Sequence, residues 1–533
     1  MVALPRLIPR WLPLLLGLVA LAAWALSDGT TPQTSAGQIG FQRGALSAFL
    51  TQPTSLSFGP DGRLYVAYSG SISALTLDAQ GTHVTNTEPL ATGLSNVLGI
   101  AFDPAAPPSP VTVYFSHQDP DATDGFNGTI SRITGPDWEI EDVITGLPTS
   151  DPYLNHMTNG IAFDGAGRLF IAQGSATNTG LAAPGGKQTY WPETPLSAAI
   201  LVADIHAPGF DGAITYAPAG PPADDNVDQI SGDVDAYASG VRNPYDLLLH
   251  SNGKIYATDN GPLSGPVIGM TSLGCAQDGG DVSQSDELNI IAQGNYYGFP
   301  NRNRGRTDPR QCIYHAPQEG NGADFTAPLA ILPSHCSCDG IAEYTSNAFA
   351  GEMQGDLIFV EFIRDNLRRG VLTADGTGVS LSTLDTDLDM PLDVTVGPTG
   401  IIYIAEYGAN RITYLEPLVP PTTPATATAT PGAATDTPTP PDTTPAPTST
   451  PTPSSGATPT ASATPQVLVG DANCDGVLNP IDAQLVLQLS AGLIGALPCG
   501  GAGDVNGDGQ VNPIDAQLIL QFAAGLIPAL PPP

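Results

Sequence analysis

The sequence feature that most constrains the fold is a two-strand unit that occurs six times along the chain. In each copy a short apolar strand leads into Asp, Gly or Pro turn residues, and a second strand ends in small or polar residues. Strand-built repeats of roughly 40–60 residues are typical of propeller blades, because each blade buries its faces against its neighbours. We therefore predict an all-β six-bladed propeller over residues 38–416; a two-sheet sandwich is the alternative, but it does not require the same hairpin six times. The copies begin near Ser55, Gly99, Gly160, Tyr245, Asp356 and Asp393.

The fourth copy carries polar residues at both of its ends. Residues 245–250 and 254–258 alternate in polarity and are joined by a Ser-Asn-Gly turn, which predicts a hairpin. Arg242 and Asn243 enter the first strand, and the D-N-G-P stretch at 259–262 leaves the second. Strand ends hold side chains and carbonyl groups in place while leaving them open to a ligand. We therefore predict a functional site there.

The N-terminus has the features of an export signal. Arg6 and Arg10 precede an apolar run at 11–26 that ends with an Ala-Trp-Ala exit. This order is typical of a secretory signal peptide over residues 1–26, and the run is short for a membrane-spanning helix, with an uncleaved anchor as the alternative. We expect a secreted, extracellular protein, with attachment to the cell surface as a variant of that expectation.

The charge balance excludes one class of partner. The chain has 17 Lys and Arg against 52 Asp and Glu, a formal net charge of −35. Such a surface repels phosphate backbones, so we expect no nucleic-acid partner. The excess of Asp fits calcium sites, and it also fits a generally acidic surface.

The cysteine count agrees with export. Two of the six cysteines, Cys474 and Cys499, lie near the C-terminus, and the other four lie in the repeat region. Disulfides are the default in an exported protein. The run His335-Cys336-Ser337-Cys338 is the alternative, a metal site, but no second pair at zinc-site spacing accompanies it.

Residues 419–466 separate two parts of the chain. They are rich in Pro, Thr, Ala and Ser and have no apolar period. Such a segment cannot bury enough apolar surface to fold, and its prolines favour extended conformations. We predict a disordered linker, with O-glycosylation as an option.

The last part of the chain contains a duplicated segment that starts at Gly470 and again 33 residues later at Gly503. Oxygen-bearing residues occupy positions 1, 3, 5, 9 and 12 of each loop, glycine occupies position 6, and position 7 offers a backbone carbonyl, which is the pattern of calcium-binding loops. Asn479, followed by Pro480, can cap a helix, and the second copy repeats this arrangement. We place the apolar faces at Ile481, Leu485 and Leu489, and at Ile514, Leu518 and Phe522. The predicted ligands are Asp471, Asn473, Asp475, Val477, Asn479 and Asp482, then Asp504, Asn506, Asp508, Gln510, Asn512 and Asp515.

This loop-helix duplication, with Asp at position 12, resembles dockerin modules. The resemblance implies a small all-α domain over residues 467–533 that binds calcium and a cohesin-type partner on a scaffold or cell-surface protein. A calcium-stabilised cap without a partner is the alternative.

Three motifs in the repeat region resemble those of soluble quinoprotein glucose/sorbosone dehydrogenases: R-N-P within 240–244, D-x-G-P at 259–262, and D-E-x-N…G-x-N-Y-G-x-P at 286–300. The resemblance covers residues 38–416 and is most specific in their middle third. It implies a six-bladed propeller that holds pyrroloquinoline quinone and calcium and oxidises a sugar or a sugar-derived aldehyde.

The resemblance also implies roles for single residues. His156 would abstract the substrate proton, Arg242 and Asn243 would bind the quinone and Arg242 would stabilise its reduced form, and Gly261 and Pro262 would bind calcium through their carbonyl groups. Arg364 stands where the family has a cofactor-binding lysine. For each residue the alternative is structural: an exposed or packed histidine, a salt bridge, or a turn contact. Asp286, Glu287 and Asn289 either support the metal site or cap the turn at 295–300.

Several positions depart from the family pattern. Leu94 replaces a glutamine, Ser175 replaces the aspartate that orients the histidine, and no arginine lies near Met390. These departures favour a rival interpretation, in which the propeller has lost its cofactor and binds carbohydrate or protein. A weaker alternative is a calcium-dependent lactonase-type hydrolase, which would need several acidic and amide side chains converging on the propeller axis.

Overall fold

The computed structural model describes most of the repeat region and parts of the C-terminal segment: residues 39–48, 50–119, 125–149, 156–180, 191–220, 224–262, 266–267, 280–281, 285–322, 324–418, 469–472, 478, 480–490, 496–497, 499, 502–507 and 510–523. The chain divides into two units, Met1–Thr428 and Ala429–Pro533. The expected signal peptide and linker lie outside the described residues. No helix among the described residues is long and apolar enough to cross a membrane.

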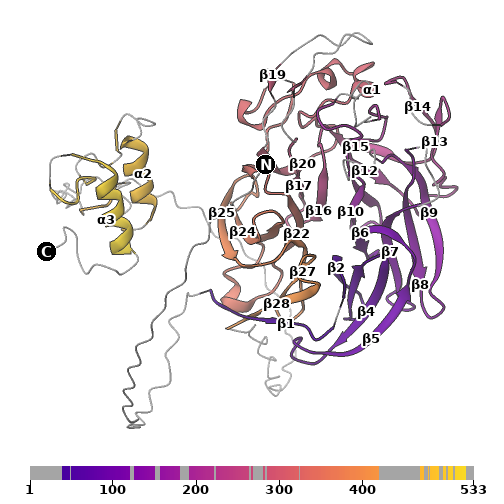
Figure 1. Ribbon diagram of the computed structural model, residues 1–533, viewed down its shortest axis with the longest axis horizontal. Helices are drawn as coiled ribbons and strands as arrows, with labels where there is room; N and C mark the ends of the chain where they lie inside the picture. Colours follow the sequence, from indigo (N-terminus) through magenta and orange to yellow (C-terminus); the bar gives the residue numbers. More distant parts are fainter. Residues whose placement is uncertain are drawn as a thin grey trace, which may run out of the picture. The chain divides into compact units, whose positions relative to one another are not determined.

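The first unit is built from six four-stranded sheets with antiparallel neighbours, which confirms the six-bladed propeller and excludes the sandwich (Figure 1). Five blades follow the chain order. The last blade is closed by the first strand of the chain, β1, which pairs with β28; the sequence had not predicted this closure. The blades consist of β2(Pro53–Phe58), β3(Leu64–Tyr68), β4(Ser71–Leu77) and β5(Val84–Ala91); β6(Ser95–Ala101), β7(Thr112–Gln118), β8(Gly128–Thr134) and β9(Glu139–Leu147); β10(Thr158–Phe163), β11(Leu169–Gln173), β12(Ala199–Ala203) and β15(Asp235–Ser239); β16(Pro244–Leu249), β17(Ile255–Asp259), β20(Ser285–Ile291) and β21(Ala330–Ser334); β22(Cys338–Glu343), β23(Leu357–Glu361), β24(Asn366–Leu372) and β25(Val379–Asp385); and β26(Pro391–Val396), β27(Ile402–Glu406), β28(Arg411–Pro417) and β1(Phe41–Ala45).

Apolar side chains hold the blades together. A separate buried cluster fills each interface between neighbouring blades, and Tyr65, Phe115, Phe170, Phe359 and Tyr403 are among their largest fully buried side chains. The alternation of the strands explains this arrangement, because successive side chains point to the two faces of a blade and both faces are covered.

The innermost strands β2, β6, β10, β16, β22 and β26 contact one another in a closed ring, and Figure 1 shows most of them gathered in the interior. Each pairs with the second strand of its blade through a register irregularity near its own start. Such bulges re-aim side chains and are common next to functional sites. The residues that enter the innermost strands therefore face the axis at one end of the propeller.

The predicted hairpin is confirmed as β16 and β17. Its turn is closed by the hydrogen bond from Gly253 N to His250 O, at 2.9 Å. Gly253 has φ of 80°, a conformation that glycine adopts without strain. Shorter elements decorate the blades: β13(Thr215–Ala217) pairs with β14(Asp228–Ser231), β18(Pro266–Val267) pairs with β19(Gly280–Asp281), and the single-turn helix α1 spans Arg302–Gly305.

The second unit contains α2(Pro480–Ser490) and α3(Pro513–Ala523), which pack against each other. Asn512 caps α3 by accepting from Ile514 N at 2.8 Å, so the predicted cap is confirmed in this copy. The predicted apolar faces were partly wrong. Ile514 is 57% exposed, and the core is formed instead by the next positions around each helix, with Leu485, Leu489 and Leu518 at its edge. The fully buried apolar residues of the two helices, among those described, are Ala483, Val486, Ala516 and Ile519.

Candidate functional site

His156 precedes β10 and is buried, with 3% of its surface exposed. Its Nδ1 lies 2.9 Å from Ser175 Oγ and 3.2 Å from Ser175 O. Ser175 Oγ donates its own proton to Thr177 O at 2.6 Å, and a carbonyl oxygen can only accept. Nδ1 must therefore carry the proton of the neutral ring, which makes Nε2 the basic nitrogen. Burial, and then the positive charge of Arg242, lower the pKa of His156 well below its usual value, so the ring is neutral at ambient pH.

Arg242 is buried at the entry of β16, and backbone and amide oxygens fix its guanidinium group. Nε and Nη2 donate to Asn178 O and Asn178 Oδ1 at 2.9 and 2.7 Å, and Nη1 donates to Asn260 O at 2.8 Å. Asn260 immediately precedes Gly261. The guanidinium plane is thus set jointly by Asn178 and by the loop that carries the predicted metal-binding carbonyls.

Asp259 joins the two polar ends of the hairpin. Its carboxylate accepts from Arg242 N at 2.9 Å and from Asn243 N at 2.7 Å, and Asn260 N donates to Asn243 O at 3.1 Å. Burial raises the pKa of Asp259 to about 7, against the opposing effect of these hydrogen bonds. The sequence did not identify this role. The signal was present, because an acidic residue ended the second strand directly opposite the R-N-P entry.

Gly261 and Pro262 are both buried, and a carboxylate anchors their loop. Gly261 N donates to Asp286 Oδ1 at 3.0 Å, and Asp286 Oδ2 accepts from Cys338 N at 3.2 Å. Asp286 therefore supports this loop. It does not cap the 295–300 turn, which is held by backbone bonds such as that from Tyr297 N to Ser239 O.

Gly174 allows the His156 imidazole and the Asn243 amide to lie close together. Asn243 Oδ1 accepts from Asn159 Nδ2 at 3.0 Å, which turns the Asn243 amide nitrogen toward other partners. A Cβ atom on Gly174 would lie 2.8 Å from His156 Cβ and 2.9 Å from Asn243 Oδ1, so no larger residue fits there. His156, Arg242, Asn243 and the Gly261 loop therefore form one buried cluster at one end of the innermost strands.

Other predicted residues lie outside this cluster. Arg364 is exposed on the loop between β23 and β24, with Nη2 3.5 Å from Ser334 O. Met390 is 43% exposed, and Leu94 packs at the edge of a core cluster between the first two blades. The structure thus places Arg364 outside the buried cluster of His156, Arg242 and Asn243.

The four described cysteines are oxidised. Cys336 and Cys338 form a disulfide, which confirms the expected bonding and rules out the zinc alternative for this pair. Cys336 Sγ lies 3.2 Å from Asp286 Oδ2, so the disulfide packs against the carboxylate that anchors Gly261. Cys312 and Cys499 are also disulfide-bonded.

In the second unit, the two loops repeat one contact. Asp482 Oδ1 accepts from Ala472 N at 2.9 Å, and Asp515 Oδ1 accepts from Val505 N at 3.0 Å. Both carboxylates are fully buried, at 0% exposure. Position 12 of each loop thus folds back onto the loop start. Among the other predicted ligands, Asp471, Asp504, Asn506, Gln510 and Asn512 are described, and Asn473, Asp475, Val477, Asn479 and Asp508 lie outside the described residues.

The oxygen donors at the propeller site fit calcium, the metal that the sequence resemblance implies. Gly261 and Pro262 offer carbonyl oxygens, and Asp259, Asp286 and Glu287 are buried nearby, an all-oxygen environment that suits calcium. Burial, and then the charge of Asp259, raise the pKa of Glu287 to about 8; a bound cation would oppose both effects. The buried unpartnered oxygen Oδ1 of Asn260 is a further acceptor at this place.

Comparisons with known proteins show which family the propeller resembles. The family model described as glucose/sorbosone dehydrogenase matches residues 203–413, from the end of β12 to β28. Similar solved structures include a glucose dehydrogenase-type putative oxidoreductase from Thermus thermophilus (22% identity, 70% of this chain and 100% of that chain, TM-score 0.48) and the PQQ-bound aldose sugar dehydrogenase of Streptomyces coelicolor (20%, 70% and 98%, 0.45). A third is the apo-form of the soluble aldose sugar dehydrogenase of Escherichia coli (18%, 71% and 99%, 0.48). No curated protein matches the chain. The match over residues 203–413 confirms the resemblance of this propeller to the glucose/sorbosone dehydrogenase family.

Proposed function

We propose that the propeller oxidises an aldose or a sugar-derived aldehyde at its carbonyl carbon, with pyrroloquinoline quinone as the electron acceptor and calcium at the Gly261–Pro262 carbonyls. The observation that carries this proposal is the neutral, buried His156, whose tautomer is set by Ser175 and whose neighbour is Arg242. The family match over residues 203–413 supports the reaction class.

In this proposal each residue has a distinct task. When bound, the quinone supplies a two-electron acceptor for hydride. His156 Nε2 takes the proton of the substrate hydroxyl group as the C–H bond breaks, and the Nδ1–H bond to Ser175 stabilises the imidazolium that forms. Arg242 would stabilise negative charge that develops on the acceptor, because its guanidinium plane is already fixed by Asn178 and Asn260. Asn243 would orient the acceptor through its amide.

Reconstitution tests this function. Purified protein is mixed with pyrroloquinoline quinone and calcium, and dye reduction is measured with a panel of aldoses and sugar aldehydes. We expect sugar-dependent dye reduction that His156→Ala abolishes and His83→Ala leaves unchanged, since the His83 side chain is 73% exposed on a distant turn. Absence of both dye reduction and protein-bound quinone absorbance would instead support the non-catalytic, carbohydrate- or protein-binding propeller.

A calcium-dependent hydrolase is the second candidate, and one observation favours it. Buried acidic and amide side chains do converge near the axis: Asp339 Oδ1 accepts from Asn260 Nδ2 at 2.9 Å, and the unpartnered Asn159 Oδ1 is buried in the neighbouring blade. Hydrolysis of lactones without added quinone, lost on chelation of calcium, would establish this reaction in place of the first.

We also propose that residues 467–533 form a dockerin-like module that binds calcium and a cohesin-type partner, and that the chain is exported to the cell exterior. The repeated contact at position 12 of both loops supports the calcium sites. Binding of the full chain to a panel of immobilised cohesin domains is measured with calcium and with chelator. We expect cohesin binding that depends on calcium and that the double substitution Asp482→Asn with Asp515→Asn abolishes. If the double substitution lowers calcium affinity but wild type binds no cohesin domain, the interpretation as a calcium-stabilised cap without a partner is supported instead.

A further inference from the structure

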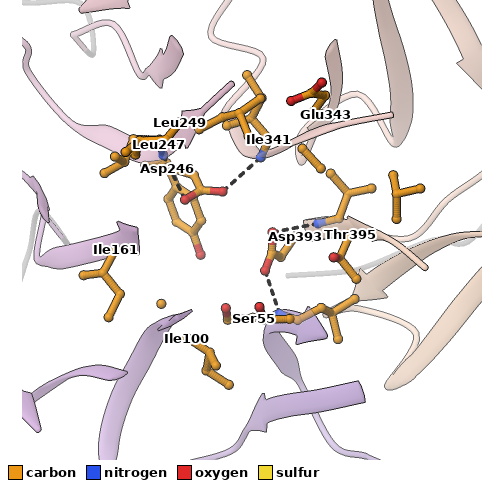
Figure 2. A pocket seen from close by; sticks show the side chains of 18 of the residues that line it. Ser55, Ile100, Ile161, Asp246, Leu247, Leu249, Ile341, Glu343, Asp393 and Thr395 are labelled. Atoms are coloured by element: carbon orange, nitrogen blue, oxygen red, sulfur yellow. Dashed lines mark hydrogen bonds between the residues drawn. The ribbon is translucent and has the colours of Figure 1, made fainter. Parts of the chain in front are cut away.

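A cavity of about 330 Å³ lies on the propeller axis, below the site described above. Every innermost strand contributes to its wall, and Figure 2 looks into it. Asp246 lies inside β16, whereas Arg242 precedes that strand and does not line the cavity, so the cavity is a different part of the channel from the guanidinium site. The six innermost strands each contribute at least one lining residue; in strand order these include Ser55, Ile100, Ile161, Asp246, Ile341 and Asp393.

Two carboxylates enter this cavity from non-adjacent blades. Asp246 accepts from Ile341 N of the next blade at 3.0 Å, and Asp393 accepts from Leu56 N of the first blade at 2.7 Å. Each also accepts from the following N–H of its own strand. Figure 2 shows both side chains pointing into the cavity. Their orientation is therefore fixed by backbone hydrogen bonds.

The two carboxylates lie close to each other, because both contact the same short segment of β22. A Cβ atom on Gly340 would clash with Asp393 Oδ1, while the next residue, Ile341, donates to Asp246. Burial raises the pKa of Asp246 to about 7. Burial, and then the charge of Asp246, raise the pKa of Asp393 well above its usual range. The pair thus carries a large electrostatic penalty when both groups are ionised.

No cationic side chain among the described residues offsets this charge. The groups that act on the two carboxylates are backbone N–H groups, Ser55 and each other. A third acid, Asp339, lies in the field of Asp246 and also has no cationic partner within this part of the chain. At the mouth of the channel, in contrast, Arg242 offsets the charge of Asp259.

An independent feature points to a ligand in the cavity. Tyr245 lines it, and its Oη is buried without any hydrogen-bond partner. The phenol lies in the field of three carboxylates, those of Asp339, Asp393 and Asp246, yet it bonds to none of them. A buried hydroxyl group without a partner is unfavourable, so a group that occupies the space between Oη and the carboxylates is favoured.

We propose that this axial cavity binds one divalent cation of the calcium class through Asp246, Asp393 and Tyr245. The polar donors are all oxygens, which are the ligands that calcium prefers, and the cavity has room for the water molecules that complete its coordination. Burial of the Asp393 carboxylate strengthens its attraction to an ion relative to that of a fully solvated carboxylate. The cation joins the fourth and sixth blades across the axis, and this role is independent of the reaction at the mouth.

Calcium counting on the full chain tests this site. Metal-stripped protein at pH 8 is dialysed against ⁴⁵Ca²⁺, and bound ions per chain are compared between wild type and Asp246→Asn with Asp393→Asn. We expect the double variant to bind one ion fewer, and the matched surface variant Asp375→Asn to bind the wild-type number. An unchanged count in a folded double variant would overturn the proposal.

A second measurement covers the case in which the double variant does not fold. Terbium replaces calcium, and its luminescence is excited through tyrosine. Residues 467–533 contain no Tyr or Trp, so the C-terminal loops do not contribute. Tyr245→Phe, which preserves the ring, should lose a saturable component of the emission that wild type and Tyr256→Phe both show. Equal emission from Tyr245→Phe and wild type would contradict a cation at Oη.

Discussion

The mouth of the propeller and the cavity beneath it are both acidic and buried, but the protein balances their charges differently. At the mouth, Asp259 accepts two backbone N–H groups and faces Arg242. In the cavity, Asp393 also accepts two backbone N–H groups, but faces a second carboxylate, Asp246. The comparison shows that hydrogen bonds orient a carboxylate in either setting. At the mouth the chain itself supplies a positive charge, that of Arg242, whereas in the cavity the proposed ion supplies it.

Matched substitutions of these two aspartates give the largest expected effect. Asp259→Asn should lower the free energy of unfolding by about 2–4 kcal/mol, because it leaves a backbone N–H group facing an amide NH₂ and leaves Arg242 without its counter-charge. Asp393→Asn disturbs the same kind of contacts but also relieves repulsion with Asp246. In chelator, we expect its effect to be smaller by about 1–2 kcal/mol, measured by urea unfolding. Equal losses would remove the contrast between the two regions.

A glycine substitution tests how closely the carboxylate pair is packed. A Cβ atom on Gly340 would clash with Asp393 Oδ1, whereas a Cβ atom on Gly165 would meet nothing within 4 Å. We expect Gly340→Ala to destabilise the protein by about 1–3 kcal/mol and to weaken the axial calcium site. Gly165→Ala should be nearly neutral. If Gly340→Ala unfolds at the same urea midpoint as wild type, the statement that Asp393 packs closely against Gly340 of β22 is contradicted.

At the mouth, Ser175 tests the histidine tautomer. Ser175→Ala removes the nearer acceptor of Nδ1–H but leaves Ser175 O at 3.2 Å, so the ring keeps part of its orientation. The turnover of reconstituted enzyme should fall by about tenfold, a smaller effect than the loss of the base itself. Ser382→Ala, on the exposed strand β25, serves as the control. Unchanged turnover in Ser175→Ala would show that the contact does not orient the base.

The pH dependence of stability isolates the contribution of the buried histidine at the mouth. The pKa of His156 is lowered in the folded state, so below about pH 6.5 the unfolded chain binds a proton that the folded chain does not. Stability is therefore lost as the pH falls, by up to about 1.4 kcal/mol per pH unit from this group. Carboxylates whose pKa is raised in the folded state, such as Asp259, change the stability in the opposite direction. The quantity to measure is therefore the difference in the free energy of unfolding between wild type and His156→Asn. A difference that does not vary between pH 6.5 and pH 4.5 would contradict the buried neutral ring.

The fold was largely predictable because its signals are local. The six hairpin units follow from alternation and turn residues, and the hairpin after Arg242 was placed within one residue of β16 and β17. The closing strand was not predictable, because Phe41–Ala45 reads as an isolated segment and finds its partner, β28, at the far end of the unit. The predicted helix faces of the second unit were wrong at Ile514, whereas Leu485, Leu489 and Leu518 do pack against the core. A 3.6-residue period marks an apolar stripe but does not show which edge of the stripe is covered.

The site was predictable where a motif carried it and not where blades meet. The family motifs led to His156, Arg242 and Gly261, which the structure brings into one cluster. Asn178 and Asn159 were missed, because their contacts with Arg242 and Asn243 span 64 and 84 residues. The axial pair was missed because Asp246 and Asp393 each look like one polar residue in an apolar strand; only closure of the ring places them together.

The most direct test of the account is a single-turnover reduction of bound quinone. Wild type and His156→Asn are loaded with pyrroloquinoline quinone and calcium, mixed with an aldose that supports dye reduction, and followed by quinone absorbance. The account predicts equal quinone binding in the two proteins and reduction that is about 10²–10⁴-fold slower in His156→Asn. Reduction at the same rate in both proteins, or no sugar-dependent reduction in wild type, would contradict it.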